Sequence, residues 1–207
     1  MPDLAKRTAQ GMGWMVFWRI CTRVLGVGST LILVKLLGPA DFGLIALALT
    51  VTQAVELLSL IGVEEALIRH ANPTRAVYDT AFTLNAGRGV ITCLVLFAAA
   101  WPTALFFDDP RLVNVMLVLA GTALIGGLEN IGMAEYRRNL VYRFEFKLRI
   151  IPRILSSLLT IGMAFLLQDY RALLIGTVVN KVMTVALSYH FHAHRPRPTL
   201  SVHPKTS

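Results

Sequence analysis

Six long apolar stretches fill this chain, and the polar segments between them alternate between basic and non-basic. The stretches cover residues 12–36, 42–62, 80–101, 112–133, 150–167 and 172–191. Each is close to the ~20 residues that an α-helix needs to cross ~30 Å of hydrocarbon at ~1.5 Å per residue. The sequence therefore predicts an all-α integral membrane protein with six transmembrane helices.

The distribution of basic residues predicts the orientation of these helices. Basic residues precede the first stretch, separate the second from the third and the fourth from the fifth, and follow the sixth: Lys6, Arg7, Arg69, Arg75, Arg137, Arg138, Arg143, Lys147, Arg149, Arg195, Arg197 and Lys205. The other three gaps carry little net positive charge. Because basic loops resist translocation, the basic gaps and both termini are predicted to be cytoplasmic.

The composition agrees with a membrane protein and argues against a nucleic-acid partner. The 207-residue chain is 55% hydrophobic and only 15% charged, and a soluble domain of this size could not bury so much apolar surface. The formal net charge is +8, but the basic residues fall at helix ends on one side of the membrane, beside anionic headgroups. The predicted partner of this charge is the lipid bilayer.

Short connections between the apolar stretches predict one helical bundle over residues 1–194, followed by a disordered cytoplasmic tail over residues 195–207. The longest cytoplasmic segment, residues 135–149, repeats apolar residues at every fourth position among arginines. This pattern predicts an amphipathic helix at the membrane interface. The fifth stretch repeats small residues at the same interval, so a neighbouring helix can approach it closely at Ser156, Thr160 and Ala164.

The charged residues inside the apolar stretches carry the functional information, because each costs at least a few kcal/mol in hydrocarbon unless it is paired or hydrated. Counted along the helices at ~1.5 Å per residue, four of these charges fall in one layer between the cytoplasmic half and the midplane of the membrane. They are Arg19, Arg23, Glu56 and Arg88. Two residues of the last stretch also come near the midplane: Asn180 and Lys181.

Two interpretations of this layer are open. In the structural one, Glu56 forms an ion pair with Arg19 or Arg23 and locks the first two helices together. Such a pair leaves at least two cations without an acidic partner inside the stretches. Unpaired cations at that depth need water or an anionic ligand, so the functional interpretation is a hydrated, positive cavity open to the cytoplasm. The arginines would bind an anionic headgroup there.

Three further polar residues lie at the ends of the predicted helices. Glu129 and Asn130 fall at the cytoplasmic end of the fourth stretch, and Arg153 follows Pro152 at the start of the fifth. Their side chains can reach the interface from these positions, so they are weaker candidates for a functional role.

No arrangement of residues typical of an enzyme occurs in the sequence. It has no HExxH, no GxSxG, no phosphate-binding Gly-rich loop and no carboxylate cluster in the apolar stretches. Cys21 and Cys93 lack metal-ligand spacing and are interpreted as buried free thiols. His190, His192 and His194 alternate along a helix, where only the first and last share a face. The chain is predicted to be a non-enzyme without a metal or cofactor.

Three segments of the chain resemble a known family of bacterial membrane proteins. They are Arg19-Ile-Cys-Thr-Arg-Val-Leu-Gly26, Leu36-Leu-Gly-Pro-Ala-Asp-Phe-Gly-Leu44 and Leu60-Ile-Gly-Val-Glu-Glu-Ala-Leu-Ile-Arg69. Tyr142-Arg-Phe-Glu-Phe-Lys147 is similar to the same family. The family comprises the Wzx-type O-antigen and exopolysaccharide flippases, in the multidrug/oligosaccharidyl-lipid/polysaccharide exporter superfamily.

The resemblance implies a fold and a function. Family members have twelve to fourteen spans in two six-helix lobes around a central cavity, and this chain resembles the N-terminal lobe. The implied substrate is an undecaprenyl-diphosphate-linked oligosaccharide, moved across the bacterial inner membrane by alternating access. By resemblance, Arg19 and Arg23 are positioned to contact the diphosphate. The implied protein partner is a second six-helix lobe, either a separate chain or another copy of this one.

Two other classes of function stay open. The chain could be half of a drug/cation antiporter of the same superfamily, although a cavity that binds cations favours carboxylates over arginines. It could also be a non-transporting assembly subunit of an exopolysaccharide complex. The charge of the cavity discriminates the first alternative, and the oligomeric state in detergent bears on the second.

Overall fold

The computed structural model describes residues 2–58, 75–133, 135–136 and 142–191, and every regular element in these ranges is helical. The elements are α1 (Pro2–Leu36), α2 (Pro39–Leu58), α4 (Arg75–Phe106), α5 (Arg111–Gly127), a single turn of 3₁₀ helix η1 (Ile131–Met133), α7 (Tyr142–Leu167) and α8 (Arg171–Phe191). The prediction of an all-α protein is confirmed for the described part of the chain.

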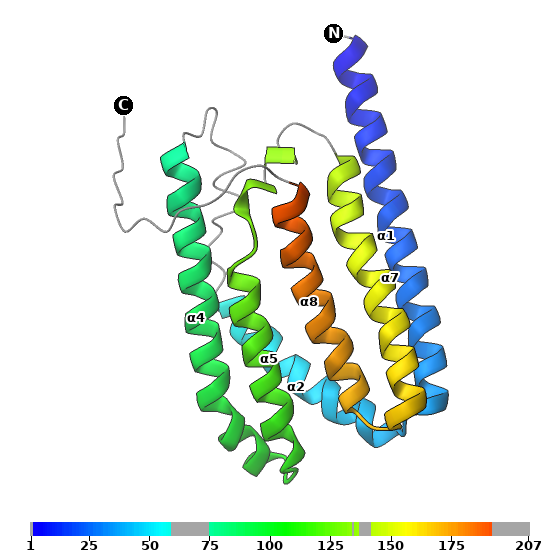
Figure 1. The fold of residues 1–207 in the computed structure, drawn as a ribbon, viewed down its shortest axis with the longest axis vertical. Helices are drawn as coiled ribbons and strands as arrows, with labels where there is room; N and C mark the ends of the chain where they lie inside the picture. The colour runs from blue at the N-terminus through cyan, green and yellow to red at the C-terminus, as the bar shows by residue number, and fades with distance from the viewer. Residues whose placement is uncertain (1, 59–74, 134, 137–141, 192–207) are drawn as a thin grey trace.

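The helices form a layer in which neighbours in space are not always neighbours in sequence. Helices α4, α5, α8, α7 and α1 lie side by side in that order, and α2 crosses behind α5 and α4 (Figure 1). Helix α8 is therefore central, because it packs on α7 at one side and on α5 at the other. Helix α1 packs mainly on α7, its neighbour in the layer, rather than on α2, its neighbour in sequence.

Two apolar clusters hold the layer together, and both include residues of α8. The larger cluster joins α2, α4 and α5 to the first turns of α8 through side chains such as Leu44, Leu96, Met116 and Leu174. The smaller one joins α1 to α7 and α8 through Leu33, Leu37, Ala164 and Ala172. Because α8 belongs to both clusters, it connects the two parts of the bundle.

The turns formed by the three less basic segments lie at one end of the helix layer. Arg111, after the α4–α5 turn, lies 3.8 Å from the Asp41 carboxylate at the start of α2. Arg111 also binds Asp109 at 2.8 Å, and this hydrogen bond holds the pKa of Asp109 below its ordinary value. On the α7–α8 turn, Arg171 pairs with Asp169. The acidic residues predicted on one side of the membrane thus share one end of the fold.

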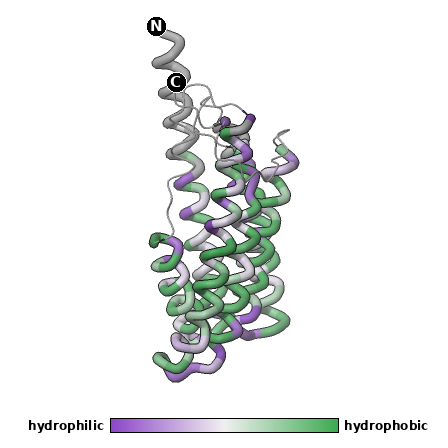
Figure 2. Tube along the Cα trace, turned by 90° about the vertical axis from the view of Figure 1, so that its left-hand side faces the viewer, coloured by the Kyte–Doolittle hydropathy of each residue, from purple (hydrophilic) through white to green (hydrophobic). Residues whose placement is uncertain are grey.

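The surface of the layer is apolar, as expected for a protein in lipid. Figure 2 shows hydrophobic residues along most of the helices and hydrophilic residues concentrated near the two ends. Leu58, Leu105, Phe106 and Leu166 are among the most exposed side chains, each at least 79% exposed. Four helical segments are long and apolar enough to span a membrane: Pro39–Leu58, Val77–Phe106, Phe146–Leu167 and Arg171–Phe191. The chain is a multi-pass membrane protein. These four segments do not test the prediction that it has six spans.

Several helices differ in extent from the predicted apolar stretches. Helix α4 begins at Arg75 rather than residue 80, and it continues through Pro102 to Phe106 instead of ending before a turn at 102–111. A proline removes one backbone hydrogen bond, but lipid offers no competing partner that would favour ending the helix there. Helix α5 ends at Gly127, and only the 3₁₀ turn η1 continues the predicted 112–133 span. Helix α2 begins at Pro39, three residues before the predicted start.

The predicted interfacial helix over residues 135–149 is also wrong in its C-terminal part. Residues 142–149 are the first turns of α7, which runs through the buried Pro152 to Leu167. Pro152 lies inside α7 and removes one backbone hydrogen bond, but the helix continues through it, so the amphipathic turns and the apolar span form one helix. Residues 137–141, and the tail at 195–207 predicted to be disordered, lie outside the described residues. Cys21 and Cys93 are free thiols as predicted, but they are half-buried rather than buried.

The small-residue face predicted on the fifth stretch is confirmed. Helix α7 packs on α8 through this face, where Ala164 is fully buried and Thr160 contacts Gly176 so closely that no side chain fits there. The Ser156 hydroxyl accepts a hydrogen bond of 3.0 Å from Asn180 on α8. Small residues thus allow the close approach of two helices.

The orientation of the layer leads to a labelling prediction. A single cysteine at Asp109, in a background without Cys21 and Cys93, should react with an impermeant maleimide added from outside intact cells. A cysteine at Glu135 should react only after the membrane is opened, because basic segments resist translocation. Equal labelling of both sites from the outside would contradict cytoplasmic termini.

Candidate functional site

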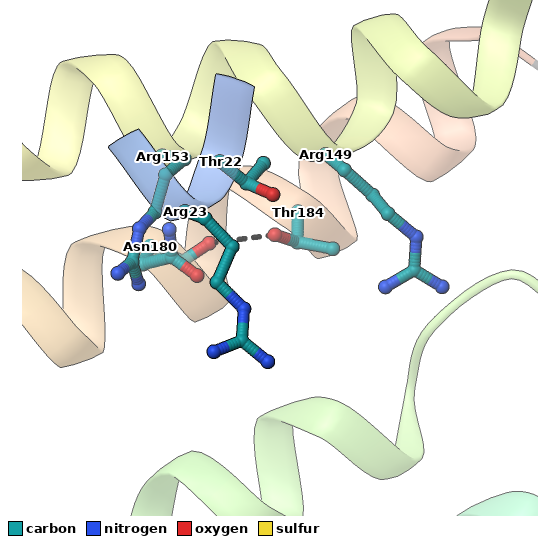
Figure 3. Close-up of a pocket in the computed structure, with 6 residues that line it drawn as sticks. All are labelled: Thr22, Arg23, Arg149, Arg153, Asn180 and Thr184. Atoms are coloured by element: carbon teal, nitrogen blue, oxygen red, sulfur yellow. Dashed lines mark hydrogen bonds between the residues drawn. The ribbon is translucent and has the colours of Figure 1, made fainter. Parts of the chain in front are cut away.

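The described part of the chain contains two adjoining cavities between α1, α7 and α8. Their volumes are about 370 Å³ and 350 Å³, and they share Thr22, Arg23 and Arg153 in their walls. The first is completed by Arg149, Asn180 and Thr184 (Figure 3), and the second by Gly26, Val27, Thr30 and Leu31. Together they form an open depression, here called the arginine cavity, whose polar groups lie mainly in the first of the two cavities.

Helix α1 supplies one wall of the arginine cavity. Thr22, Gly26 and Thr30 recur every fourth residue and share a helix face with Arg23. The Thr22 hydroxyl donates a hydrogen bond of 3.0 Å to the Arg19 carbonyl oxygen, within the helix. The Arg23 side chain is exposed and extends into the cavity (Figure 3).

Helix α7 supplies the opposite wall and two further cations. Arg149 and Arg153 are four residues apart, so they share the helix face that lines the cavity. A Cβ atom placed on Gly26 of α1 would lie 3.1 Å from Arg153 Nη2. The Arg153 guanidinium therefore packs against the α1 backbone, at the one position of that wall where the helix has no side chain.

Helix α8 forms the floor of the cavity with uncharged polar groups. The Asn180 amide donates to the Ser156 hydroxyl at 3.0 Å, and Ser156 in turn donates to the Arg153 carbonyl oxygen at 3.2 Å. The Thr184 hydroxyl donates to the Asn180 carbonyl oxygen at 2.8 Å, the bond drawn in Figure 3. This chain of hydrogen bonds links the floor to the turn of α7 that bears Arg153.

The electrostatic character of the arginine cavity is positive. Three arginines line it, and none of the residues lining the two cavities in the described ranges is a carboxylate. Guanidinium groups offer several N–H donors in a planar fork that matches carboxylate and phosphate oxygens. The arrangement can bind an anion, and it is unsuited to binding a cation.

The arginines that were predicted to lie at a similar depth in the membrane are separated in the structure. Arg23 lines the arginine cavity, whereas Arg19, four residues earlier on α1, is exposed outside its walls. Arg88 is half-buried on α4, at the opposite edge of the layer, with α5, α8 and α7 between it and α1 (Figure 1). One cavity formed by all three arginines is thus not seen, because the order of helices in the layer separates α1 from α4.

The ion pair of Glu56 that one of the two interpretations requires is not present among the residues that the structure describes. Glu56 is exposed in the last turn of α2, and no ion pair among the described residues joins it to Arg19 or Arg23. The cause is packing, since α2 lies against α5 and α4 while α1 lies against α7. Glu56 therefore does not lock the first two helices.

Of the two polar residues predicted near the midplane of the last helix, one faces the cavity and the other faces away. Asn180 lies in the cavity floor, whereas Lys181 turns toward α5, where Nζ is 3.8 Å from a Glu129 carboxylate oxygen. Gly126 makes room for the Lys181 side chain, because any Cβ there would overlap it. Consecutive helical residues point about 100° apart, which explains the division.

Sequence reasoning missed the part of the site on α7. Arg149 was interpreted as a topology determinant, and Arg153 as a residue that could reach the interface. The signal that could have identified them is the spacing of four between two arginines beside the small-residue face of the same helix. That spacing places both cations on one face of α7. The sequence near these arginines does not show that this face packs on α1.

The fold and the arginine cavity define a multi-pass membrane protein with an open, positively charged site. The chain belongs to a known family: residues 32–206 match the family described as polysaccharide biosynthesis protein. The predicted resemblance to polysaccharide exporters is thereby confirmed, and the related proteins act in transport and polysaccharide or lipopolysaccharide biosynthesis.

Two relatives support this membership. The succinoglycan biosynthesis transport protein ExoT of Rhizobium meliloti is 24% identical over 201 residues, which cover 96% of this chain and 40% of the relative. The lipopolysaccharide biosynthesis protein WzxC of Escherichia coli is 23% identical over 118 residues, covering 57% of this chain and 24% of the relative. The chain thus spans less than half the length of these relatives. No solved structure matches it.

Proposed function

We propose that this chain is one lobe of a flippase that moves an undecaprenyl-diphosphate-linked oligosaccharide across the bacterial inner membrane. The observation that carries the proposal is the arginine cavity in a member of the polysaccharide biosynthesis family. A lipid-linked diphosphate must take its charge past an apolar barrier, and arginines at a membrane-embedded cavity offset that cost. Membership of the family points to transport in polysaccharide biosynthesis, and the arginines of the cavity provide groups that bind a diphosphate.

The proposed arrangement places the arginine cavity toward the cytoplasmic leaflet, with both termini inside. Arg149 follows a basic segment predicted to be cytoplasmic, and the acidic turns gather at the far end of the layer. The cavity is open, so a second six-helix lobe is the proposed partner that completes a closed path. That lobe belongs to another segment, another chain or a second copy.

The residues lining the cavity favour this proposal over a drug/cation antiporter. An antiporter that binds cations needs acidic groups at its site, and the first of the two cavities is lined by three arginines, two threonine hydroxyls and an amide. A non-transporting assembly subunit would have no use for a cationic depression within its apolar surface. The name of one relative includes transport, which agrees with the same choice.

Complementation of a flippase-deficient strain tests the proposal. The chain is expressed together with the C-terminal half of a relative, and surface polysaccharide is measured. Arg23→Ala should lower the transport rate roughly ten- to hundredfold, because hydrogen bonds between charged groups contribute about 1.5–3 kcal/mol. Arg23→Lys should be intermediate, since an ammonium lacks the planar fork. Lys35→Ala, on the same helix at the other end, is the matched control and should transport normally.

One outcome would show that the arginines have a structural role and do not bind the substrate. If Arg19→Ala, Arg23→Ala and Arg88→Ala all transport at the rate of the unmodified chain while staying folded, the positive-cavity interpretation fails. Measuring all three variants also tests whether Arg19 and Arg88, which lie outside the arginine cavity, contact the headgroup at another stage of transport.

A further inference from the structure

The apolar clusters that include α8 use the end of that helix beside the acidic turns, here called the acidic end of the layer. Helix α8 contributes Ala172 and Leu174, from its first turn, and Tyr170 just before it belongs to the larger cluster. In the smaller cluster, Leu33 and Ala164 come from the last turns of α1 and α7. These clusters therefore join α8 to its neighbours at the acidic end.

At the opposite end of the layer, α8 meets the turn that follows α5. Three polar contacts, here called the latch, join side chains of α8 to this turn: Lys181 Nζ to a Glu129 carboxylate oxygen at 3.8 Å, the Asn130 backbone amide to the Ser188 hydroxyl at 3.1 Å, and the Tyr189 hydroxyl to the Leu128 carbonyl oxygen at 2.9 Å. The two side chains of the ion pair remain 36% and 35% exposed, so this pair contributes little to stability. Water can replace each of the three contacts once the groups separate.

The turn that follows α5 is also fixed to α4. Gly127 and Gly89 lie so close that a Cβ atom on Gly127 would be 2.9 Å from the Gly89 Cα atom. The Asn85 amide donates a 3.1 Å hydrogen bond to the Gly127 carbonyl oxygen. Beyond the glycine, Ile131 packs against the buried Ala81 of α4. Because backbone contacts of this kind do not slide, the turn moves with α4 and α5 rather than with α8.

Helix α8 is fixed to α7 along the same half of the layer. Thr160 contacts Gly176 so closely that no side chain fits on that glycine, and the Asn180 amide donates to the Ser156 hydroxyl at 3.0 Å. Helix α1 in turn packs mainly on α7. The layer thus consists of two parts that lie side by side (Figure 1), one formed by α2, α4 and α5 and the other by α1, α7 and α8.

We propose that the latch is a releasable closure between these two parts, which open at the latch end while the apolar clusters at the acidic end act as the pivot. Close packing holds the pivot, whereas the latch consists of contacts that hydration replaces, so the latch end separates first. The arginine cavity lies within the second part, so its three walls move together. The inference does not depend on the proposed function, because it concerns contacts within this chain.

Distances between pairs of spin labels on the purified full-length chain in detergent test the proposal. The labels are attached to cysteines introduced at exposed positions, in a background where Cys21 and Cys93 are serine. One pair spans the two parts on the latch side, at Leu84 of α4 and Ala186 of α8, and the other spans them at the acidic end, at Leu105 of α4 and Leu166 of α7. Opening about the pivot lengthens the first distance and leaves the second unchanged.

Two variants weaken the latch to different extents. Lys181→Met keeps the length of the side chain and should raise the population with the longer latch-side distance roughly two- to fivefold, the factor expected for an exposed ion pair. Ser188→Ala removes the acceptor of the buried Asn130 amide and should raise it roughly five- to hundredfold. Lys35→Met, which removes an exposed lysine at the acidic end of α1, is the matched control and should leave both distances unchanged.

The coupling between Lys181 and Glu129 has a test of its own. The double variant Lys181→Met with Glu129→Gln should open no further than Lys181→Met alone, because either change already removes the ion pair. In the chain that keeps both residues, a carbodiimide can join the Glu129 carboxylate to the Lys181 amine. This cross-link, identified by mass spectrometry, should abolish the longer latch-side distance, and it does not require a destabilised variant to fold.

Two results would overturn the proposal. The first is a latch-side distance distribution that is the same in Lys181→Met, Ser188→Ala and Lys35→Met and does not respond to the cross-link. The second is an equal broadening of both distances in Lys181→Met and Ser188→Ala, since the acidic end would then not serve as a pivot. A longer latch-side distance in both variants, with the distance at the acidic end unchanged, would support it.

Discussion

Gly127→Val should remove most of the folded protein from the membrane, because it prevents α4 and α5 from packing. A Cβ atom on Gly127 would lie 2.9 Å from the Gly89 Cα atom and 3.1 Å from the Asn85 carbonyl oxygen. Both are backbone atoms, so neither can move without displacing a helix. The Asn85 amide also donates a 3.1 Å hydrogen bond to the Gly127 carbonyl oxygen, and this bond would be lost. Overpacking alone costs about 1–3 kcal/mol.

The measurement is the yield of monodisperse protein after detergent extraction, together with its unfolding temperature. Gly89→Ala should behave similarly, since its Cβ would lie 2.7 Å from the Gly127 Cα atom. Gly121→Val on the same helix α5, with nothing within 4 Å of the added Cβ atom, carries the same β-branched penalty and controls for it. Equal yields of Gly127→Val and Gly121→Val would show that α4 and α5 do not cross at these glycines.

Asn130→Ala should lower the stability of the chain by roughly 1–3 kcal/mol, because it leaves a buried backbone donor without its acceptor. Asn130 is 1% exposed, and its side-chain oxygen accepts the Gly132 amide at 3.0 Å. The Asn130 backbone amide donates to the Ser188 hydroxyl at 3.1 Å, which joins this turn to the end of α8. The 3₁₀ turn η1 begins one residue later, so the loss also releases that turn.

Thermal unfolding in detergent and limited proteolysis after residue 127 check this prediction. Asn114→Ala is the matched control, because Asn114 is exposed on α5 and its loss leaves no buried donor unsatisfied. If Asn130→Ala and Asn114→Ala unfold at the same temperature, the turn after α5 does not depend on the Asn130 side chain.

The helices themselves were largely predictable, and their limits were not. Apolar stretches mark membrane helices because each residue contributes to the transfer free energy independently of the fold. The residue at which a helix ends depends on the surroundings of that end in the folded protein. Phe106 extends α4 beyond its apolar stretch because lipid provides no partner for a backbone released at Pro102. Helix α7 begins at Tyr142, before its apolar stretch, because its amphipathic turns continue directly into the span.

The candidate site shows the same division at the level of single residues. Arg23 was predicted to line a positive cavity because a charge inside an apolar stretch is exceptional, whatever surrounds it. Arg153 was placed among the weaker candidates because its sequence neighbours, at a helix end after a proline, suggested a residue that reaches the interface. Its contact with Gly26 depends on α1 and α7 being adjacent, although more than a hundred residues separate these positions in the chain.

The sequence alone determined that this protein is helical, lies in a membrane and belongs with the polysaccharide biosynthesis family, because hydropathy and local motifs act over a few turns of one helix. Only the tertiary structure decided which helices are neighbours, and with them which charges meet: Arg153 with the wall of α1, and Lys181 with Glu129. In lipid the hydrophobic effect does not favour the association of helices. Close packing at small residues therefore determines which helices become neighbours. Gly26, Gly126 and Gly176 leave room for side chains of the neighbouring helices, at positions where the hydropathy of the chain is uninformative.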